Sequence, residues 1–390
     1  MFKVKQKKIL VFINCGWEQF PTVELALKKK YVLYAISFET NYFYKKYFKK
    51  VLYCAANEET KIFDFVNKIK PHGIISDQCD FSYMVQSKIA QKFKLKGPDL
   101  TQAKIFTNKL LQRKLISKSI LKSPAFFSIK KFSQLNKKKL DKIKTKKIVI
   151  KPSDNRGGIG IKILQKSEFN EKNFTDALEY SQNKTIIVEE FIEGEHYNLD
   201  GLIINNKAFL VGISHNKKMK NMIVNKSLYY DVAFLKKKNI SNYFKKLCEI
   251  FKPTFGFIHG EIIINKHNDI YLTEIANRGG GIRISNTVLE QISKWDMNDY
   301  IIQNSLYNKF NLSKKNKETN NVLIKFLPIR TKVDKIKVDE KNIIFYKKLS
   351  NSKNITNGTE RNFMVIAKGE NIKDINRNIK KFINNKVLCI

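Results

Sequence analysis

Glycine is scarce in this chain of 390 residues, with only 16 copies, and arginine supplies only seven of the 74 basic residues. No apolar run approaches the length that a helix needs to cross a bilayer. The five cysteines are scattered, with no CxxC pair and no spacing typical of a zinc site. These features argue against a membrane-spanning protein, a disulfide framework and a zinc module, and they favour buried thiols in a reducing compartment.

The N-terminal segment is rich in lysine and precedes the apolar run 9–13, a pattern that superficially resembles a secretory signal peptide. The run is too short for one, because it breaks at Asn14, Trp17 and Glu18. We expect it to form a first β-strand, and we expect the protein to be cytoplasmic.

A net charge of +39 would suit a polyanion-binding protein. However, base and phosphate recognition favours the planar arginine fork, whereas this chain uses lysine almost everywhere, with abundant Asn, Ile, Phe and Tyr. That mixture is typical of an AT-rich coding sequence. We therefore expect a solvated, lysine-coated surface, with no specific nucleic-acid partner and no membrane partner.

The first hundred residues alternate apolar strand patterns with helical patterns. Strands are expected at 8–14, 31–37 and 73–76, and helices at 20–29, 60–70 and 82–93. This alternation predicts an open, parallel α/β sheet, a class that often binds ligands where its strands end. No GxGxxG follows the first strand, so a dinucleotide site is not supported.

The remaining residues mix the two patterns differently and predict α+β structure. Helices are expected at 101–120, 130–147, 288–308 and 371–384. Strands are expected at 125–129, 148–150, 186–213, 255–277, 322–328 and 362–368. A composition shift after the polar run 313–321 predicts a small C-terminal α/β domain.

The segment 257–282 carries the strongest chemical signal. It predicts two short apolar strands joined by a polar turn, with Glu261 on the first strand and Glu274 on the second. Hairpin strands lie about 5 Å apart, so both carboxylates could hold one cation. A carboxylate pair beside an arginine and bare glycine backbone suits a divalent metal bound to phosphate oxygens. The alternative is an ordinary hairpin with two solvated glutamates.

Six of the 16 glycines fall in two clusters, 157, 158 and 160 and then 279–281, and Arg156, Arg278 and Arg283 lie in or beside them. Arginine forks and exposed backbone suit anions. The first cluster lies between apolar segments, which predicts strand, glycine loop, strand; the Walker pattern GxxxxGK[ST] is absent. Such a loop can fold over phosphates, with Lys151 adding charge. A plain β-hairpin is the alternative.

A third segment of interest covers residues 186–201. A strand ending in Glu189-Glu190-Phe191-Ile192 would present backbone groups to the edge of an adenine. Glu195, just past Gly194, would accept the ribose hydroxyls. Acidic turns of this kind are more often simply solvated.

In this order and spacing the segments resemble the ATP-grasp superfamily, most closely its carboxylate–amine ligases and the ATP-binding domain of the carbamoyl-phosphate-synthase large chain. The matching elements are Asn108-Lys109 with Arg113, Lys151-Pro152 with the glycine loop, Glu189–Ile192 with Gly194-Glu195, His259–Glu261, and Glu274–Arg278 with the glycine triplet. The resemblance implies an N-terminal pre-ATP-grasp domain over 1–100, a two-lobed ATP-grasp domain over 101–312 and a small C-terminal domain over 313–390. The smaller lobe is expected at about 122–190 and the larger at about 191–312.

The resemblance also implies roles for single residues. ATP would be bound by Lys109, Lys151, Ser153, Gly157, Gly158, Gly160, Glu189, Phe191, Ile192 and Glu195. The cofactor Mg²⁺, or Mn²⁺, would be bound by Glu261 and Glu274. Many relatives carry Asn two residues after the second metal glutamate, where this chain has Ala276; Asn277 follows one residue later as the remaining candidate. Arg278 would act in catalysis with Lys151, and the substrate carboxylate would lie near Arg278, Gly280 and Gly281.

Two histidines are candidates for contact with substrate. His259 lies two residues before Glu261 and so shares its strand face. His215 follows a strand, in a loop that often borders substrate in this superfamily. For each, the alternative is a histidine that only satisfies local hydrogen bonds.

The activity that the resemblance implies is an ATP-dependent ligation. ATP would convert a small carboxylate into an acyl-phosphate, and an amine would then form the amide bond, releasing ADP and phosphate. The alternatives are an ATP-grasp ligase using ammonia, bicarbonate or another nucleophile, and a non-catalytic nucleotide-binding module. The expected partners are the two small-molecule substrates and, by analogy, a second copy in a homodimer.

Overall fold

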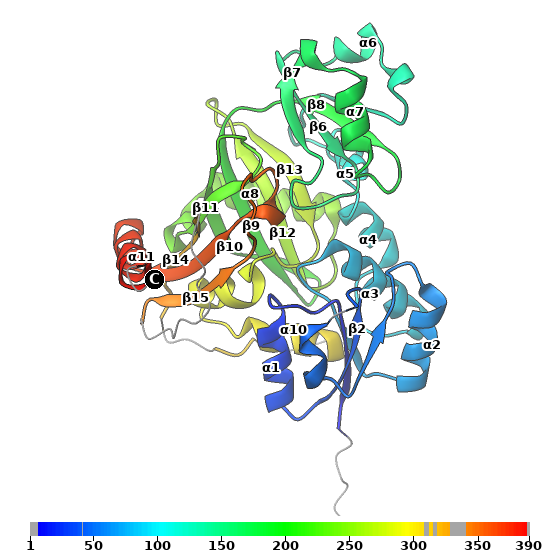
Figure 1. Ribbon diagram of the computed structural model, residues 1–390, viewed down its shortest axis with the longest axis vertical. Helices are drawn as coiled ribbons and strands as arrows, with labels where there is room; N and C mark the ends of the chain where they lie inside the picture. Colours follow the sequence, from blue (N-terminus) through cyan, green and yellow to red (C-terminus); the bar gives the residue numbers. More distant parts are fainter. Residues whose placement is uncertain (1–6, 41, 308–311, 315–317, 328–340, 388–390) are drawn as a thin grey trace, which may run out of the picture.

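The computed structural model of the chain describes residues 7–40, 42–307, 312–314, 318–327 and 341–387. Cys389, one of the five scattered cysteines, lies outside this part, and the other four are free thiols. Figure 1 shows three regions around a common centre, with the N-terminal unit at the bottom and the glycine-loop lobe at the top. No helix of the described ranges is long and apolar enough to cross a membrane.

The N-terminal unit is the open parallel sheet that the sequence predicts. Its order is β3-β2-β1-β4, from β1 (Ile9–Ile13), β2 (Val32–Ser37), β3 (Lys50–Tyr53) and β4 (Gly73–Ile75). Leu10 and Phe12 face α1 (Phe20–Lys28), while Val11 and Ile13 face α2 (Glu59–Ile69) and α3 (Asp80–Phe93). Because helices cover both faces, β1 is apolar throughout rather than alternating.

The smaller lobe is an antiparallel sheet in the order β5-β8-β6-β7. Its strands are β5 (Phe126–Ile129), β6 (Lys147–Pro152), β7 (Lys162–Gln165) and β8 (Ile186–Glu190), packed with α7 (Glu171–Leu178). The helix expected at 130–147 is wrong, since only the four-residue α6 (Lys137–Leu140) forms there. Asn136 caps α6 by accepting a hydrogen bond from Lys139 N at 3.0 Å, which starts the helix late.

The larger lobe is an eight-stranded sheet in the order β13-β12-β9-β10-β11-β14-β16-β15. Its strands are β9 (Glu195–Ile204), β10 (Lys207–Lys218), β11 (Asn225–Tyr230), β12 (Phe257–Ile264), β13 (Ile270–Ala276), β14 (Asn321–Leu327), β15 (Ile343–Lys348) and β16 (Phe363–Gly369). One face is covered by α8 (Lys238–Phe251) together with α4 (Leu100–Phe106) and α5 (Lys109–Ile116). The last three strands join the sheet through β11–β14 pairing, so the C-terminal residues extend the larger lobe instead of building a sheet of their own.

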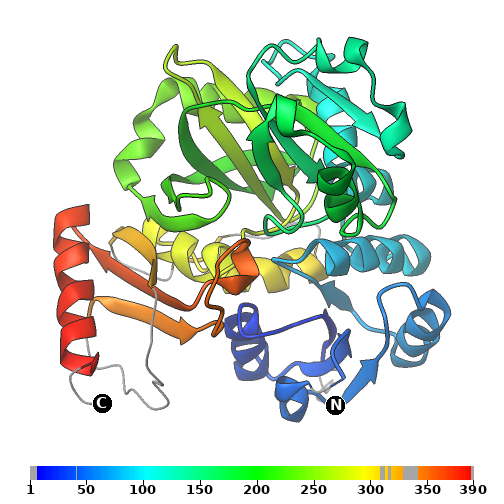
Figure 2. The ribbon, with the colours of Figure 1, turned by 45° about the horizontal axis from the view of Figure 1, so that its top comes forward.

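The helices after the glycine triplet differ in one respect from the expectation. In place of one helix over 288–308, the structure has two, α9 (Leu289–Ser293) and α10 (Met297–Leu306), because Lys294 adopts φ of 68° and ends α9; residue 308 lies outside the described residues. A π-helical turn, Ile284–Val288, precedes α9. The final helix α11 (Ile372–Val387) packs against β16 and β14, and Figure 2 shows it at the far side of the sheet from the N-terminal unit.

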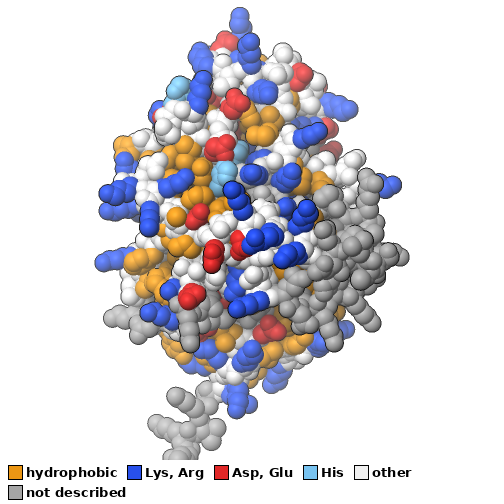
Figure 3. All heavy atoms as spheres, turned by 90° about the vertical axis from the view of Figure 1, so that its left-hand side faces the viewer, with side chains coloured by type: hydrophobic (Ala, Val, Ile, Leu, Met, Phe, Trp, Pro, Cys, Tyr) orange, Lys and Arg blue, Asp and Glu red, His pale blue; other side chains and the backbone are white. Residues whose placement is uncertain are grey.

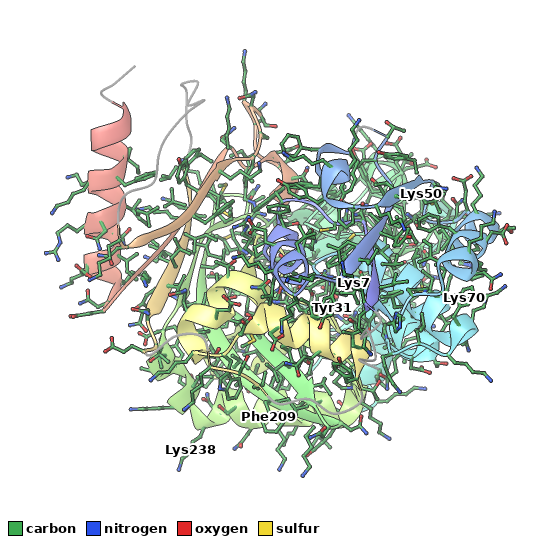
Figure 4. All side chains as sticks on the ribbon, turned by 90° about the horizontal axis from the view of Figure 1, so that it is seen from below. Lys7, Tyr31, Lys50, Lys70, Phe209 and Lys238 are labelled. Atoms are coloured by element: carbon green, nitrogen blue, oxygen red, sulfur yellow. The ribbon has the colours of Figure 1, made fainter. Side chains whose placement is uncertain are left out.

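The surface is coated with lysine as expected from the composition. In Figure 4, Lys50, Lys70 and Lys238 extend outward at the periphery from three different elements. Figure 3 shows basic side chains over the described part of one face, mixed with acidic and apolar ones. Charges spread in this way contribute a general positive field.

Candidate active site

A cavity of about 590 Å³ lies where the N-terminal unit and both lobes meet. The C-terminal ends of β1, β2 and β4 contribute one wall, and β6, β8 and the glycine loop contribute a second. The larger lobe adds β9, β12 and β13, and the segment 349–361 closes a further side. Twelve of the 18 candidate residues that the sequence singled out line this one space.

Lys151 of β6 and Glu189 of β8 form a buried ion pair that lines the cavity. Glu189 also pairs with Arg113 of α5, whose Nε lies 2.7 Å from Oε2. Burial would raise the pKa of Glu189, but these two cations outweigh it and lower the pKa to about 2. Burial lowers the pKa of Lys151 to about 8, against the pull of Glu189, so the ammonium stays charged at neutral pH. Both carboxylate oxygens of Glu189 thus serve to hold cations.

Lys109 is the first residue of α5, directly after Asn108, whose side chain caps the helix. Its Nζ donates to Glu274 Oε1 at 2.7 Å and to the backbone carbonyl of Asn155 in the glycine loop. The cap therefore directs Lys109 to the point where the loop meets β13.

The glycine loop between β6 and β7 is folded down on the other parts of the cavity. Gly157, Gly158 and Gly160 have φ of 64°, 78° and 76°, a region that favours glycine. Gly157 O accepts a hydrogen bond from Gly358 N at 2.7 Å, and Arg156 Nη1 donates to Cys79 Sγ at 2.6 Å. The loop thus contacts both the N-terminal unit and the C-terminal segment.

Two of the expected loop residues do not line the cavity. Ser153 is fully buried, and its hydroxyl donates to Asn183 Oδ1 at 2.8 Å. A methyl group on Gly160 would lie 2.7 Å from Pro152 Cγ and 3.0 Å from Tyr180. Ser153 and Gly160 therefore pack against other protein atoms and help to fix the loop conformation, while Gly157 and Gly158 line the cavity.

The far end of the cavity from the N-terminal unit has an apolar lining. Phe191 and Ile192, which follow β8, line it together with Val149, Ile163 and Leu272. Phe191 N donates to Lys147 O at 3.2 Å, which fixes the chain where it leaves the sheet. These apolar residues, called the base slot below, offer the apolar surroundings in which a purine base can bind.

Glu195 and His215 lie together on the sheet face opposite the cavity. Register pairs Tyr197 with His215, and Asn198 with Ser214 and Glu261, so odd-numbered residues of β9 point away. The exposed Glu195 carboxylate contacts His215 Nε2 there. The ribose role expected for Glu195 and the substrate role expected for His215 do not fit this placement, because each side chain is on the wrong side of its strand.

His196, one residue later, does line the cavity. Its Nε2 is buried without a hydrogen-bond partner among the described residues. Burial, helped by nearby Lys218, lowers the pKa of His196 to about 4, so the ring is neutral at neutral pH. A neutral ring with one unpartnered nitrogen is suited to a ligand hydroxyl, which is the contact that the sequence analysis gave to Glu195.

Glu261 and Glu274 are direct partners in the β12–β13 ladder and both line the cavity. Burial would raise the pKa of Glu261, but His259 and Lys218 outweigh this and hold it below its usual range. No group of three or more His, Cys, Asp or Glu side chains placed to hold a metal ion occurs in the described ranges. The pair fits a hard divalent cation that takes its remaining oxygen ligands from phosphate groups and water.

Asn277 takes no part in this pair. Its Nδ2 donates to the carbonyls of Phe255 and Phe257, both at 2.6 Å, and its Oδ1 accepts from Tyr83 Oη at 3.0 Å. Because all its polar groups are used between buried elements, Asn277 does not fit the expected role of metal ligand.

Arg278 borders the cavity and is held by the N-terminal unit. Its Nε and Nη2 bind the two oxygens of Asp80 at 2.6 and 2.8 Å, and Nη1 binds Gly279 O at 3.0 Å. Burial would lower the pKa of Arg278, but Asp80 outweighs it and raises it further. Gly281 lines the cavity beside it, whereas Gly280 packs against the His259 ring.

His259 lies between two carboxylates and lines the cavity. Its Nδ1 contacts Asp200 Oδ1 at 2.6 Å, and its Nε2 lies 3.9 Å from Glu261 Oε1. Tyr230 Oη donates to the other Asp200 oxygen at 2.7 Å. Burial would lower the pKa of His259, but Asp200 outweighs it and raises the pKa to about 10. The ring is therefore a cation beside Glu261 and Gly280.

Several cavity residues were missed by the sequence analysis. They come from the N-terminal unit, from β9 and β10 and from the C-terminal segment, where the sequence offered no motif; they are Glu18, Gln78, His196, Lys218 and Arg361. Asp80, which holds Arg278, was missed as well. Arg361 carried one signal, since it is among only seven arginines. Its guanidinium stacks 4.0 Å from the Phe326 ring, and burial lowers its pKa to about 10.

Comparison with known proteins agrees with this geometry. A family model described as an ATP-grasp domain matches residues 106–281. No curated protein sequence matches the chain.

Solved structures match the chain over almost its whole length. The L-amino acid ligase from Bacillus licheniformis is 14% identical with a TM-score of 0.75, covering 98% of both chains. The phosphoribosylglycinamide synthetase from Anaerococcus prevotii is 17% identical with a TM-score of 0.73, covering 97% of this chain and 98% of that one. The biotin carboxylase domain of the Hydrogenobacter thermophilus 2-oxoglutarate carboxylase, solved with MgADP and bicarbonate, is 12% identical with a TM-score of 0.71, covering 92% and 86%. At these identities the likeness concerns the fold.

Proposed function

We propose that this chain, in which residues 106–281 match an ATP-grasp domain, is an ATP-dependent carboxylate–amine ligase. One observation carries the proposal. A single cavity brings the carboxylate pair Glu261 and Glu274 together with Lys151, the glycine loop and Arg278. Phosphoryl transfer to a carboxylate needs this set, because the site must balance negative charge on the nucleotide and on the acceptor together.

The nucleotide would lie between the two lobes. Its base would occupy the slot at Phe191 and Ile192, and its ribose would approach His196. Lys109, Lys151 and the backbone of Gly157 and Gly158 would bind its phosphates. Glu189 would act indirectly, because its ion pair with Lys151 holds that lysine in position for the phosphates.

Glu261 and Glu274 would hold Mg²⁺, or Mn²⁺, which when bound neutralises phosphate charge during transfer. Lys109 donates to Glu274 at 2.7 Å, so this lysine would turn from the carboxylate toward phosphate in the loaded enzyme. The residues fit the cation because two carboxylates face the cavity side by side.

The carboxylate substrate would lie against Arg278 and the Gly281 backbone. One of its oxygens attacks the terminal phosphorus of ATP, ADP leaves, and an acyl-phosphate forms. An amine then attacks the acyl carbon, phosphate leaves with the former carboxylate oxygen, and the amine loses a proton. The docked glycine loop would exclude the water that hydrolyses such an intermediate.

The test is magnesium-dependent release of ADP from ATP, with pooled small carboxylates in the presence and absence of amines. We expect one pool to stimulate release, and we expect Glu274→Gln to abolish it because a metal ligand is lost without a change in volume. Mn²⁺ binding, followed by electron paramagnetic resonance, should weaken in the same variant. Full activity of Glu274→Gln would overturn the metal assignment. Stimulation by bicarbonate or ammonia alone would favour another class of ATP-grasp ligase.

Two further properties belong to this proposal. A cytoplasmic location suits the four described cysteines, all of which are free. A homodimer remains a prediction by analogy, which sedimentation of the purified chain would test.

A further inference from the structure

A strained turn at the end of the glycine triplet links the catalytic domain to the N-terminal unit. Ile282 and Arg283 have φ of 56° and 63°, and this left-handed region is unusual for a β-branched residue. Each backbone N–H is bound by a side chain of the N-terminal unit. Ile282 N donates to Glu18 Oε1, and Arg283 N donates to Gln78 Oε1 at 3.0 Å. Strain of this kind persists where the surrounding contacts impose it, often at a functional site.

Glu18 lacks a charged partner at this turn. No ion pair joins its carboxylate to a lysine or arginine side chain of the described residues, although Glu18 lines the cavity and its Oε1 accepts from Ile282 N. Burial raises the pKa of Glu18, and the more distant guanidinium groups of Arg361, Arg156 and Arg278 oppose that rise only in part. A half-buried carboxylate without an ion pair favours a cationic ligand.

Gln78 presents the opposite chemistry next to Glu18. Its side chain is only 7% exposed and lines the cavity, and its Oε1 is fixed by Arg283 N. The other end of the amide, Nε2, is therefore directed away from that bond, and it has no hydrogen-bond partner among the described residues. A buried donor without a partner favours an acceptor on the ligand.

Glu18 and Gln78 lie near the place where the proposed substrate would have the atoms next to its carboxylate. A methyl group on Gly281 would lie 3.4 Å from Glu18 Oε1. Arg278, three residues earlier, is the cation that the proposed function gives to the substrate carboxylate. A ligand carboxylate between Arg278 and Gln78 would therefore have its α-carbon substituents close to Glu18.

We propose that the carboxylate activated by this enzyme is an α-amino acid, held as a zwitterion with its ammonium group on Glu18 and a carboxylate oxygen on Gln78 Nε2. This inference rests on the proposed function and names its substrate class. The pairing with Glu18 keeps the bound amino group protonated and unreactive. The attacking amine must then come from a second molecule. The amino acid bound at Glu18 therefore supplies the carboxylate and does not also act as the nucleophile.

The test compares each of the twenty L-amino acids with its des-amino carboxylate, for example alanine with propionate. Equilibrium binding is measured by calorimetry with Mg²⁺ and a non-hydrolysable ATP analogue, and ADP release is measured separately. We expect at least one amino acid to bind about tenfold or more tightly than its des-amino counterpart, as a charged hydrogen bond provides. We expect Glu18→Gln to remove that preference.

Two further variants make the result specific. Gln78→Glu keeps the acceptor for Arg283 N but replaces the donor by an oxygen, so it should weaken binding of the amino acid and of the des-amino carboxylate alike. Glu24→Gln is the matched control, because Glu24 is an exposed carboxylate of α1 outside the cavity. It should retain wild-type affinities. Thermal melting of each variant checks that the fold is intact.

The outcomes separate this inference from the proposed function. Equal affinity for amino acids and des-amino carboxylates, or a preference that survives in Glu18→Gln, would overturn the inference while ADP release could still establish a ligase. Selective amino acid binding that depends on Glu18, without any stimulated ADP release, would support the inference and contradict the ligase. Absence of both binding and release would overturn both.

Discussion

Arg278 and Asp80 are 198 residues apart in the chain and form a two-point ion pair, with N–O distances of 2.6 and 2.8 Å. Asp80 is the first residue of α3 in the N-terminal unit, whereas Arg278 follows β13 in the larger lobe. The N-terminal unit therefore fixes the direction of a guanidinium that borders the proposed reaction centre. This unit positions part of the site in addition to forming a wall of it.

Replacing Asp80 by Asn should show whether Asp80 positions Arg278 for catalysis without affecting nucleotide binding. The variant keeps the volume of the side chain but weakens the grip on Arg278, so we expect kcat for carboxylate-dependent ADP release to fall about tenfold or more. The KM for ATP should change little, since the ion pair lies outside the base slot. Asp64→Asn, at an exposed position of α2, is the control. A raised KM for ATP with unchanged kcat would contradict the positioning role.

Adjacent residues of β9 should behave oppositely toward ATP. His196 lines the cavity, whereas Glu195 lies on the other face of the sheet with His215. We expect His196→Ala to raise the KM for ATP several-fold through loss of a hydrogen bond of about 1 kcal/mol. Glu195→Ala should leave that KM within experimental error. The reverse ranking in steady-state kinetics would show that the ribose contact is made from Glu195 after all.

The stabilising effect of Glu189 should depend on pH. Its folded-state pKa of about 2 is lower than the ordinary value of 4.5, so below pH 4.5 the unfolded chain takes up a proton that the folded chain does not. The stabilisation is complete above pH 4.5 and is lost as the pH falls toward 2. At pH 7, Glu189→Gln leaves Arg113 and Lys151 buried without their carboxylate, which we expect to cost about 3 kcal/mol.

Urea unfolding of the wild type and of Glu189→Gln checks this prediction at pH 7 and pH 4. The difference in free energy of unfolding should be smaller at pH 4. Glu179→Gln, an exposed carboxylate at the end of α7, should change stability by less than about 0.5 kcal/mol at both pH values. An equal difference for Glu189→Gln at the two pH values would contradict the assigned pKa.

Glycines of the loop should differ in what an added methyl group does. Gly157→Ala meets no atom within 4 Å, so its cost is the left-handed backbone alone, about 1 kcal/mol. Gly160→Ala has the same backbone cost and also a contact of 2.7 Å with Pro152 Cγ. We expect Gly160→Ala to lower the Tm more, and Gly157→Ala to affect mainly the response to ATP concentration. Equal melting temperatures would show that the loop relaxes around Pro152.

The sequence alone determined the fold class and the elements that carry local signals. Alternation of apolar strands and helices predicted the parallel N-terminal sheet, since burial of both faces leaves an apolar run such as 9–13. The spacing of Glu261 and Glu274 placed them opposite each other on one hairpin. Local rules were less reliable at 130–147, where lysine-rich sequence suggested a helix but only Lys137–Leu140, which begins after the Asn136 cap, is α-helical.

Only the tertiary structure decided which side chains share the cavity. His196 faces the cavity and Glu195 does not, because of the register in which β9 pairs with β12. A shift of one residue in that register would move every β9 side chain to the opposite face of the sheet. Asn277 hydrogen-bonds to Tyr83, which is 194 residues away in the sequence. Glu18, Gln78 and Asp80 reach the site because an open α/β sheet presents its strand ends at one edge. Local patterns carry no information about contacts between residues about 200 positions apart, such as Arg278 with Asp80, and these contacts complete the site.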